Sequence, residues 1–379
     1  MTLFDWEQRK PNNFLTESKI IGHKGNQAKK LTVKLWGKGI QEKQNAYSGS
    51  NKTQYYIRKS GQLMYGKLDF LHAAFGIVPN KLNNYESTID SPAFDVKNAN
   101  SSFLLNLFLR KNFYLYYGER ANGSRKARRI HEKDFLMMPI KIPSIQEQNK
   151  IVVLIKIINK LITLQQRKLE QLNLLKQAMS QQIFTNKKFP KIRFKNFTSI
   201  WKDYKFEDIF AEFSVKSKRE NEFRIFSSTN NGMEIRTGRV SGGSNIGYKI
   251  INDGDIVLSP QNLWLGNINL NDIGIGLVSP SYHTFKIINI NPLFIKPQLH
   301  SKQMLFKYKM ASIQGASVVR RNLDMNAFSK ITLKAPTNEL EQGKIAIFCS
   351  YIEKIIGFQQ KRINYLITLK KALLQNMFV

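Results

Sequence analysis

The sequence predicts an α+β fold built from two copies of one unit, each a basic domain followed by a long helix. Residues 147–184 align with residues 341–378 without a gap, at an offset of 194 (341 minus 147), and 15 of these 38 positions are identical. Further upstream the offset becomes 193 and pairs Gly39 with Gly232 and Tyr55 with Tyr248. A repeat of this length sets the architecture. The 379 residues are therefore expected to form two domains, each with its own core.

Each conserved segment carries apolar residues at alternating spacings of four and three, interrupted by a glutamine. The stripe includes Ile151, Ile158, Ile162, Gln165 and Leu172 in the first copy, and Ile345, Ile352, Ile356, Gln359 and Leu366 in the second. This heptad pattern predicts that the two helices pair. Two units related by an approximate twofold axis would bring them together antiparallel, with the glutamines near the midpoint. The alternative is two separate helices, each packed on its own domain.

Strand signals occupy the segments between the helices. Residues 254–259 and 282–287 are rich in β-branched and aromatic residues, and short helical patterns lie between such segments, which favours mixed α+β domains. Each long helix is expected to begin after a proline, at Pro143-Ser144 and Pro336-Thr337, where Ser or Thr can cap free amides. We interpret Asn291-Pro292 as a strand-to-helix junction.

The composition points to a polyanionic partner. Lys and Arg number 59 against 27 Asp and Glu, a formal charge of +32, and nucleic acid is the leading candidate. An AT-rich genome would inflate Lys but would not explain the shortage of acids. The single cysteine, Cys349, excludes a disulfide framework and a thiolate zinc cluster within one chain. No secretory signal or membrane-spanning run is visible, so we expect a soluble, cytoplasmic protein without membrane association.

No motif predicts catalysis or a metal site. Asp5 with Glu17-Ser18-Lys19 fits a paired-carboxylate nuclease only loosely, and the five histidines show no metal-ligand spacing. Asn291 to Phe294 is one residue from a methyltransferase tetrapeptide but lacks a glycine-rich cofactor loop. Gly61-x4-Gly66-Lys67 lacks the hydroxyl that a phosphate-binding loop needs, so we interpret it as a turn before a strand.

Basic side chains among glycines and small polar residues are the candidates for DNA contact. They are Lys34, Lys38, Arg58, Lys67, Arg125, Arg128, Arg129, Lys218, Arg219, Arg236, Arg239, Arg320 and Arg321, together with Gln261. The Arg pairs at 128–129 and 320–321 occupy matching places, which favours a sequence-independent phosphate role. Base readers should differ between the copies. We therefore assign base reading to Lys38, Gln41 and Lys67 in the first domain, and to Arg236, Arg239, Gln261, Asn262 and Trp264 in the second.

The duplicated helix start resembles a known family. It reads Pro143-x3-Glu147-Gln148-x2-Ile151 and Pro336-x4-Glu341-Gln342-x2-Ile345, and in the second copy a domain entry at Pro190-Lys191-Ile192-Arg193-Phe194 leads to Trp201. These features are similar to the specificity subunit of Type I restriction-modification complexes. The first copy lacks that entry segment, and Trp6 is the expected counterpart of Trp201.

The resemblance implies two target-recognition domains, residues 1–141 and 188–334, and two conserved spacer helices, residues 142–187 and 335–379. Each domain would read one half of an interrupted sequence in double-stranded DNA. The helices would dock two modification subunits, which carry the methyltransferase chemistry and S-adenosylmethionine, and restriction subunits would add ATP- and Mg-dependent translocation and cleavage. This chain would have no cofactor and no catalytic residue of its own. The alternatives are a stand-alone DNA-binding regulator and a fused methyltransferase or nuclease.

Overall fold

A computed structural model describes residues 6–25, 27–44, 52–120, 128–185, 187–236, 244–314 and 321–378. The chain divides into two compact units, one formed by Met1–Leu164 with Asn364–Val379 and the other by Gln165–Ile363. The division passes through both long helices. Each unit, named unit 1 and unit 2 here, therefore contains one domain and half of each helix, which differs from the four consecutive segments that we predicted.

Unit 1 is built on an antiparallel four-stranded sheet of order β2-β10-β7-β8. Its strands are β1 (Glu7–Arg9), β2 (Leu15–Ser18), β3 (Ile21–Lys24), β4 (Leu31–Val33), β5 (Ile40–Glu42), β6 (Gln54–Ile57), β7 (Leu63–Tyr65), β8 (Phe75–Ile77), β9 (Glu86–Ser87), β10 (Ala93–Val96) and β11 (Ile140–Ile142). Its helices are η1 (Pro11–Asn13), η2 (Phe70–His72), η3 (Asn80–Leu82), α1 (Ser101–Phe108), α2 (Lys111–Glu119), α3 (Glu132–Met137) and the first half of α4 (Ile145–Ile183). An aromatic core that includes Phe75, Phe94 and Phe135 lies between sheet and helices.

Unit 2 contains a second sheet of the same kind, with order β13-β20-β17-β18. Its strands are β12 (Lys202–Lys205), β13 (Phe210–Phe213), β14 (Phe226–Thr229), β15 (Gly232–Ile235), β16 (Lys249–Ile251), β17 (Ile256–Leu258), β18 (Ile268–Leu270), β19 (Gly276–Val278), β20 (His283–Ile287), β21 (Ser312–Gln314), β22 (Arg321–Leu323) and β23 (Thr332–Ala335). Its helices are α5 (Phe206–Ile209), η4 (Leu263–Leu265), α6 (Pro292–Leu299), α7 (Lys302–Met310), α8 (Met325–Ser329) and the first half of α9 (Glu339–Met377).

The strand orders confirm the duplication. Strands β2, β10, β7 and β8 correspond in sequence order and in sheet position to β13, β20, β17 and β18. The small sheet β1-β11, which precedes α4, corresponds to β12-β23, which precedes α9. The predicted strands at 254–259 and 282–287 are β17 and β20, and Asn291 caps α6 through its side chain. The mixed α+β prediction is thus confirmed.

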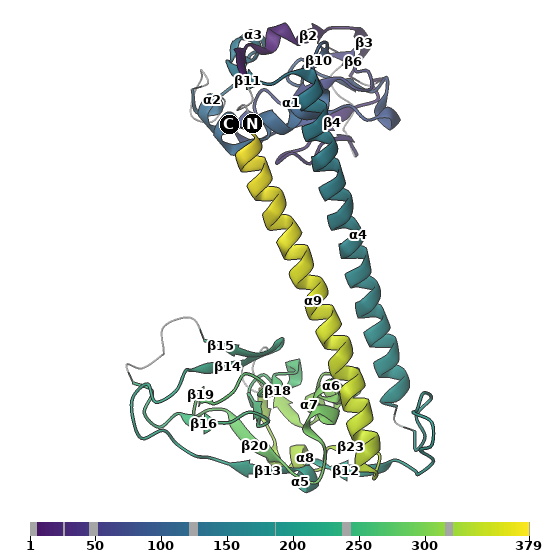
Figure 1. Ribbon diagram of the computed structural model, residues 1–379, viewed down its shortest axis with the longest axis vertical. Helices are drawn as coiled ribbons and strands as arrows, with labels where there is room; N and C mark the ends of the chain where they lie inside the picture. Colours follow the sequence, from purple (N-terminus) through teal and green to yellow (C-terminus); the bar gives the residue numbers. More distant parts are fainter. Residues whose placement is uncertain are drawn as a thin grey trace. The chain divides into compact units, whose positions relative to one another are not determined.

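The two long helices run antiparallel within each unit (Figure 1). In unit 2, Lys176 Nζ lies 2.8 Å from Glu353 Oε1, while Gln359 Nε2 donates to Gln165 Oε1 at 2.6 Å. Residue numbers therefore rise along α4 as they fall along α9. In unit 1, the last turn of α9 packs into the same core cluster as the first turns of α4. The antiparallel pairing is confirmed, and the alternative of two separate helices is wrong.

None of the ten predicted seam positions is exposed to solvent. Among them, Ile151, Ile158, Ile345 and Gln359 are buried, and the other six, Ile162, Gln165, Leu172, Ile352, Ile356 and Leu366, are half-buried. The two glutamines meet through the hydrogen bonds given above. A buried polar pair lowers the stability of an apolar seam but fixes its register.

A buried glutamine joins the first long helix to its domain. Gln148 is 2% exposed, and its Nε2 donates to the carbonyl of Pro143 at 2.9 Å while its Oε1 accepts from the amide of Asn100 at 2.9 Å. Asn100 is the N-cap of α1. The neighbouring Glu147 accepts a hydrogen bond from the indole of Trp6 at 3.3 Å. Side chains of the Glu-Gln motif thus tie α4 to the strand before it, to α1 and to Trp6.

The second copy repeats this junction. Gln342 is 2% exposed, donates to the carbonyl of Pro336 and accepts from the amide of Asn291, both at 2.8 Å. Glu341 accepts from the indole of Trp201 at 3.3 Å. Trp6 and Trp201 therefore make equivalent contacts, as we predicted. Both glutamates lie in the first turn of their helices, where a negative charge is favourable, and they also hold these tryptophans.

We predict that Gln148→Met destabilises the protein by about 2–5 kcal/mol, because it leaves a buried carbonyl and a buried amide without partners. Gln146→Met, on an exposed position of the same turn, is the matched control and should change stability by under about 0.5 kcal/mol. The measurement is the free energy of unfolding in urea. Equal stability of the two variants would contradict the role of Gln148 as a junction.

Candidate nucleic-acid interface

The loop between β4 and β5 presents lysines on unit 1. Lys34 and Lys38 are both exposed, and the amide of Lys34 donates to the carbonyl of Gly39 at 2.9 Å, which closes the loop. Gln41, on β5, is also exposed. These side chains are open to a phosphate or a base edge, so their contact with DNA stays a prediction.

Arg58, which we predicted to contact DNA, lies inside unit 1. It is 2% exposed, with Nε donating to Ser87 Oγ and Nη1 to the carbonyl of Ser18, both at 2.8 Å. Burial lowers the pKa of its guanidinium to about 10. Arg58 therefore uses its hydrogen-bond donors inside the fold, where it joins the end of β6 to neighbouring segments. Its guanidinium is not accessible to a phosphate. The assignment of Arg58 to DNA binding was wrong.

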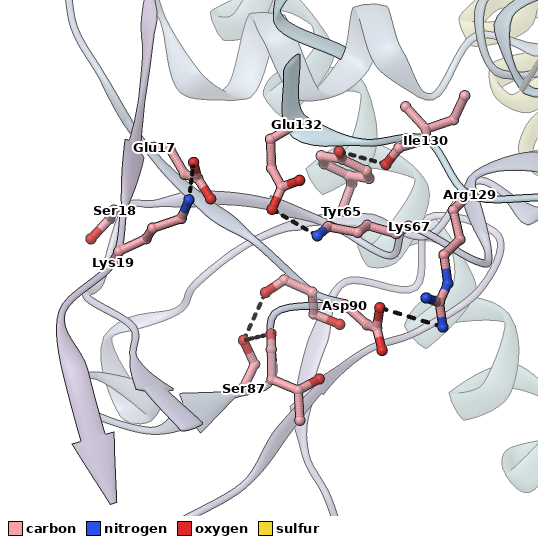
Figure 2. A network of polar contacts seen from close by, with 12 residues as sticks. Glu17, Ser18, Lys19, Tyr65, Lys67, Ser87, Asp90, Arg129, Ile130 and Glu132 are labelled. Atoms are coloured by element: carbon pink, nitrogen blue, oxygen red, sulfur yellow. Dashed lines mark hydrogen bonds and ion pairs between the residues drawn. The ribbon is translucent and has the colours of Figure 1, made fainter. Parts of the chain in front are cut away.

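Lys67 is a second correction. It is 5% exposed, and its Nζ lies 2.7 Å from Glu132 Oε1, as Figure 2 shows. Burial opposes the charged form of Glu132, but the hydrogen bond and the charge of Lys67 outweigh burial and lower the pKa of this carboxyl. Lys67 therefore neutralises a buried acid. It does not read a base in this structure, and the turn that it follows is no phosphate-binding loop.

The same network fixes the segment that carries the first Arg pair (Figure 2). The hydroxyl of Tyr65 donates to the carbonyl of Ile130 at 2.9 Å, and Arg129 lies 3.9 Å from Asp90. Arg129 is exposed, and an ion pair this long and open to solvent contributes little, so the guanidinium stays accessible to a phosphate. Arg128 donates to the carbonyl of Glu119 at 2.7 Å.

The candidate cations of unit 2 divide into three groups. Lys218 and Arg219 are exposed in the turn before β14, and Arg236 is half-buried just after β15. Arg239 and Arg320, like Arg125 of unit 1, lie outside the residues that the structure describes. The third group is Arg321 with its neighbours.

The structure brings three of the predicted residues of unit 2 together. The guanidinium of Arg321 lies over the indole of Trp264, 5.0 Å from the ring centroid, and its amide donates to the carbonyl of Gln261 at 3.3 Å. The Gln261 side chain is exposed, and Arg321 Nε is buried without a hydrogen-bond partner among the described residues. Amide and guanidinium groups are the side-chain types that pair with adenine and guanine edges. This cluster can therefore present both beside an aromatic ring.

Sequence reasoning missed Trp36, which is 58% exposed in the loop that carries Lys34 and Lys38. A signal was present, because an indole between two lysines and beside two glycines is unusual for a core residue.

Both long helices also carry a second apolar line on their exposed side. Its members are 47% to 70% exposed and match between the copies: Val153 with Ile347, Ile157 with Tyr351, and Leu164 with Phe358. We name these positions the exposed stripes. The helix seam does not use them, and exposed apolar side chains that recur at matching positions of two copies are candidates for contact with another protein.

Two kinds of site are absent from the part of the chain that the structure describes. It contains no group of three or more His, Cys, Asp or Glu side chains arranged to hold a metal ion. Within the same residues, no helix combines the length and the apolar character required to cross a membrane.

Comparison by sequence finds no matching protein-family model and no matching curated protein. Solved structures match the chain over nearly its full length. The S subunit of a Type I restriction-modification system from M. genitalium has a TM-score of 0.58 at 12% identity, covering 100% of this chain and 97% of that one. The HsdS subunit from Thermoanaerobacter tengcongensis has a TM-score of 0.52 at 12% identity, covering 98% and 96%. The chain has the specificity-subunit fold.

A third structure with this specificity-subunit fold comes from work on complex assembly and conformational transition of the type I R-M system. It has a TM-score of 0.57 at 12% identity and covers 100% of this chain and 99% of that chain. The resemblance drawn from the Glu-Gln motif and the repeat is thus confirmed at the level of the fold.

We predict that Lys67→Met destabilises unit 1 by about 1–3 kcal/mol at neutral pH, because it leaves the carboxylate of Glu132 buried without its cation. Lys67 lowers the pKa of Glu132, so the stability it contributes is present above the ordinary glutamate value of 4.5 and is lost as the pH falls through the lowered value. The difference between the variant and the natural protein should therefore shrink in acid. Unfolding in urea across pH measures it. If Lys67→Met instead has the stability of the natural protein but binds DNA more weakly, Lys67 contacts DNA and this interpretation is wrong.

Proposed function

We propose that this chain is the DNA-recognition subunit of a Type I restriction-modification complex. The observation that carries the proposal is the duplication itself: two domains of one fold, with diverged loops, joined by helices whose exposed stripes match. The specificity-subunit fold supports it. In this role the chain is non-catalytic and cytoplasmic, and its partners supply S-adenosylmethionine, ATP and Mg.

Recognition would be bipartite. Both domains have exposed cations at their loops, and the formal charge of +32 favours a long polyanion. The proposed base readers differ, with Lys38 and Gln41 in the first domain and Arg236 and Gln261 in the second. Two domains with different side chains on one scaffold would read two different half-sites.

The exposed stripes support docking of two copies of one partner. Because Val153, Ile157 and Leu164 are matched by apolar residues of the second copy, a protein that binds one stripe would find a similar surface on the other. We assign this role to two modification subunits, with restriction subunits joining them. A stand-alone DNA-binding regulator, the alternative reading, would need no such matched stripes. A fused methyltransferase or nuclease would need catalytic motifs that the sequence does not provide.

Exchanging residues 188–334 for the corresponding domain of another specificity subunit should change one half of the methylated sequence and leave the other half intact. Each domain contributes its own base contacts, so the two halves should separate. The measurement is methylation-aware sequencing of DNA from cells that express the chimera together with a modification subunit. An unchanged target, or a change in both halves, would contradict bipartite reading.

Ile347→Asp combined with Phe358→Asp should reduce the number of bound modification subunits from two to one, since each change places a charge in the α9 stripe, in a contact that excludes water, and leaves the α4 stripe intact. Phe306→Asp is the matched control, because Phe306 is an equally exposed aromatic residue of unit 2 that lies on α7, outside the stripe. Co-purification measures the complex, and circular dichroism of the isolated chain checks folding. A folded double variant that still binds two modification subunits, as the mass of the co-purified complex would show, would contradict the role of the α9 stripe in docking.

A further inference from the structure

Trp36 has a backbone conformation that favours glycine. Its φ is +59°, in the left-handed region that bulky side chains rarely adopt. Such strain persists only where surrounding contacts impose it, and it concentrates at functional sites. Here the amide of Trp36 donates to the carbonyl of His72 at 2.7 Å, and the amide of Gly37 donates to the carbonyl of Ala73 at 2.9 Å. The loop of residues 34–39 is therefore held against η2 through its backbone.

Core packing does not explain this conformation. The indole is 58% exposed, and its ring contact is the edge of His72, with the centroids 5.5 Å apart. The strain thus presents a large apolar ring to solvent. Lys34 and Lys38, both exposed, flank it in the sequence. An aromatic ring between two cations suits a partner that combines flat apolar faces with negative charge.

The loop is also rigid at its base. Gly37 has a φ of +64°, and a Cβ at that position would lie 2.9 Å from Leu109 Cδ2, at the end of α1. The loop therefore sits closely on the helix, besides its two hydrogen bonds to η2. A ring that is already held in place loses little conformational entropy when it binds.

The second domain carries a tryptophan in the short helix that corresponds to η2, and not in the loop that corresponds to residues 34–39. The repeat offset of 193 (263 minus 70) superposes η2 on η4 in sequence, and η4 contains Trp264. Arg321 lies over that indole at 5.0 Å. The hairpin β14-β15, the counterpart of β4-β5, has Asn230 and Asn231 at its tip instead of a tryptophan. Each domain thus has an indole and cations at this short helix, with Trp36 beside η2 in the first domain and Trp264 within η4 in the second.

We propose that Trp36 inserts at a base step of the half-site that the first domain reads, where its indole stacks on a base while Lys34 and Lys38 contact the flanking phosphates. Apolar side chains that enter DNA in this way unstack a step and bend the duplex, and stacking on a base contributes free energy without releasing counterions. This inference rests on the proposed function, because it requires that unit 1 bind duplex DNA.

The test uses the full chain in complex with the modification subunit. Its binding is measured to two short DNA duplexes, one that carries the sequence that the complex methylates and one in which that sequence is scrambled. Trp36→Gly should melt at the same temperature as the natural protein or higher, since glycine removes the strain. It should bind the target on the order of ten-fold more weakly, with an unchanged dependence on salt. Trp36→Phe should retain most of the affinity. Lys38→Ala should instead reduce the salt dependence.

2-Aminopurine placed in turn at each adenine of the target locates the inserted ring. We expect one position at which binding of the natural complex changes the fluorescence and Trp36→Gly abolishes that change. If Trp36→Gly binds the target with the same affinity and the same fluorescence change as the natural complex, the insertion of Trp36 is wrong, whereas the proposed function stands. A natural complex that fails to distinguish target from scrambled DNA would instead overturn the proposed function.

Discussion

Two buried glutamines determine where the long helices leave their domains. Gln148 and Gln342 each join the carbonyl at the end of a strand to the amide that caps the next domain helix. Both partners of each glutamine are backbone groups, and the one domain side chain that the neighbouring glutamates share between the copies is a tryptophan, Trp6 or Trp201, so the junction places few demands on the rest of the domain. This tolerance allows one scaffold to carry two domains whose surfaces have diverged.

The far ends of the helices use a second shared contact. Phe184, at the end of α4, packs on Phe294 of α6 with the ring centroids 5.6 Å apart, and Phe378, at the end of α9, packs on Phe103 of α1 at 5.2 Å. Each helix thus begins at one domain through a polar junction and ends in the core of the other through an aromatic ring. The identities in the repeat coincide with these contacts and with the seam.

Periodicity predicted the parts of the fold that depend on regular spacing. The pairing of the helices followed from the heptads and its antiparallel direction from the approximate twofold relation of the repeats, while the equivalence of Trp6 and Trp201 followed from the family resemblance. The site was predicted less well, because composition does not distinguish an exposed cation from a buried one. Lys67 is neutralised by Glu132, which lies far from it in the sequence, and no local pattern announces that contact. Trp36 was missed because its significance lies in backbone strain, which the residue type alone does not reveal.

The division of the chain into units also bears on the order of folding. Unit 2 is one continuous stretch, Gln165–Ile363, whereas unit 1 takes its last helical turns from Asn364–Val379. A ribosome that adds about 5–20 residues per second needs roughly 10–40 s to synthesise the stretch between them. Until the second domain has been synthesised, the first domain therefore lacks Phe378 in its core. Its half of the helix seam is exposed during the same interval. A chaperone that protects nascent apolar surface would be needed most by the first domain during that interval.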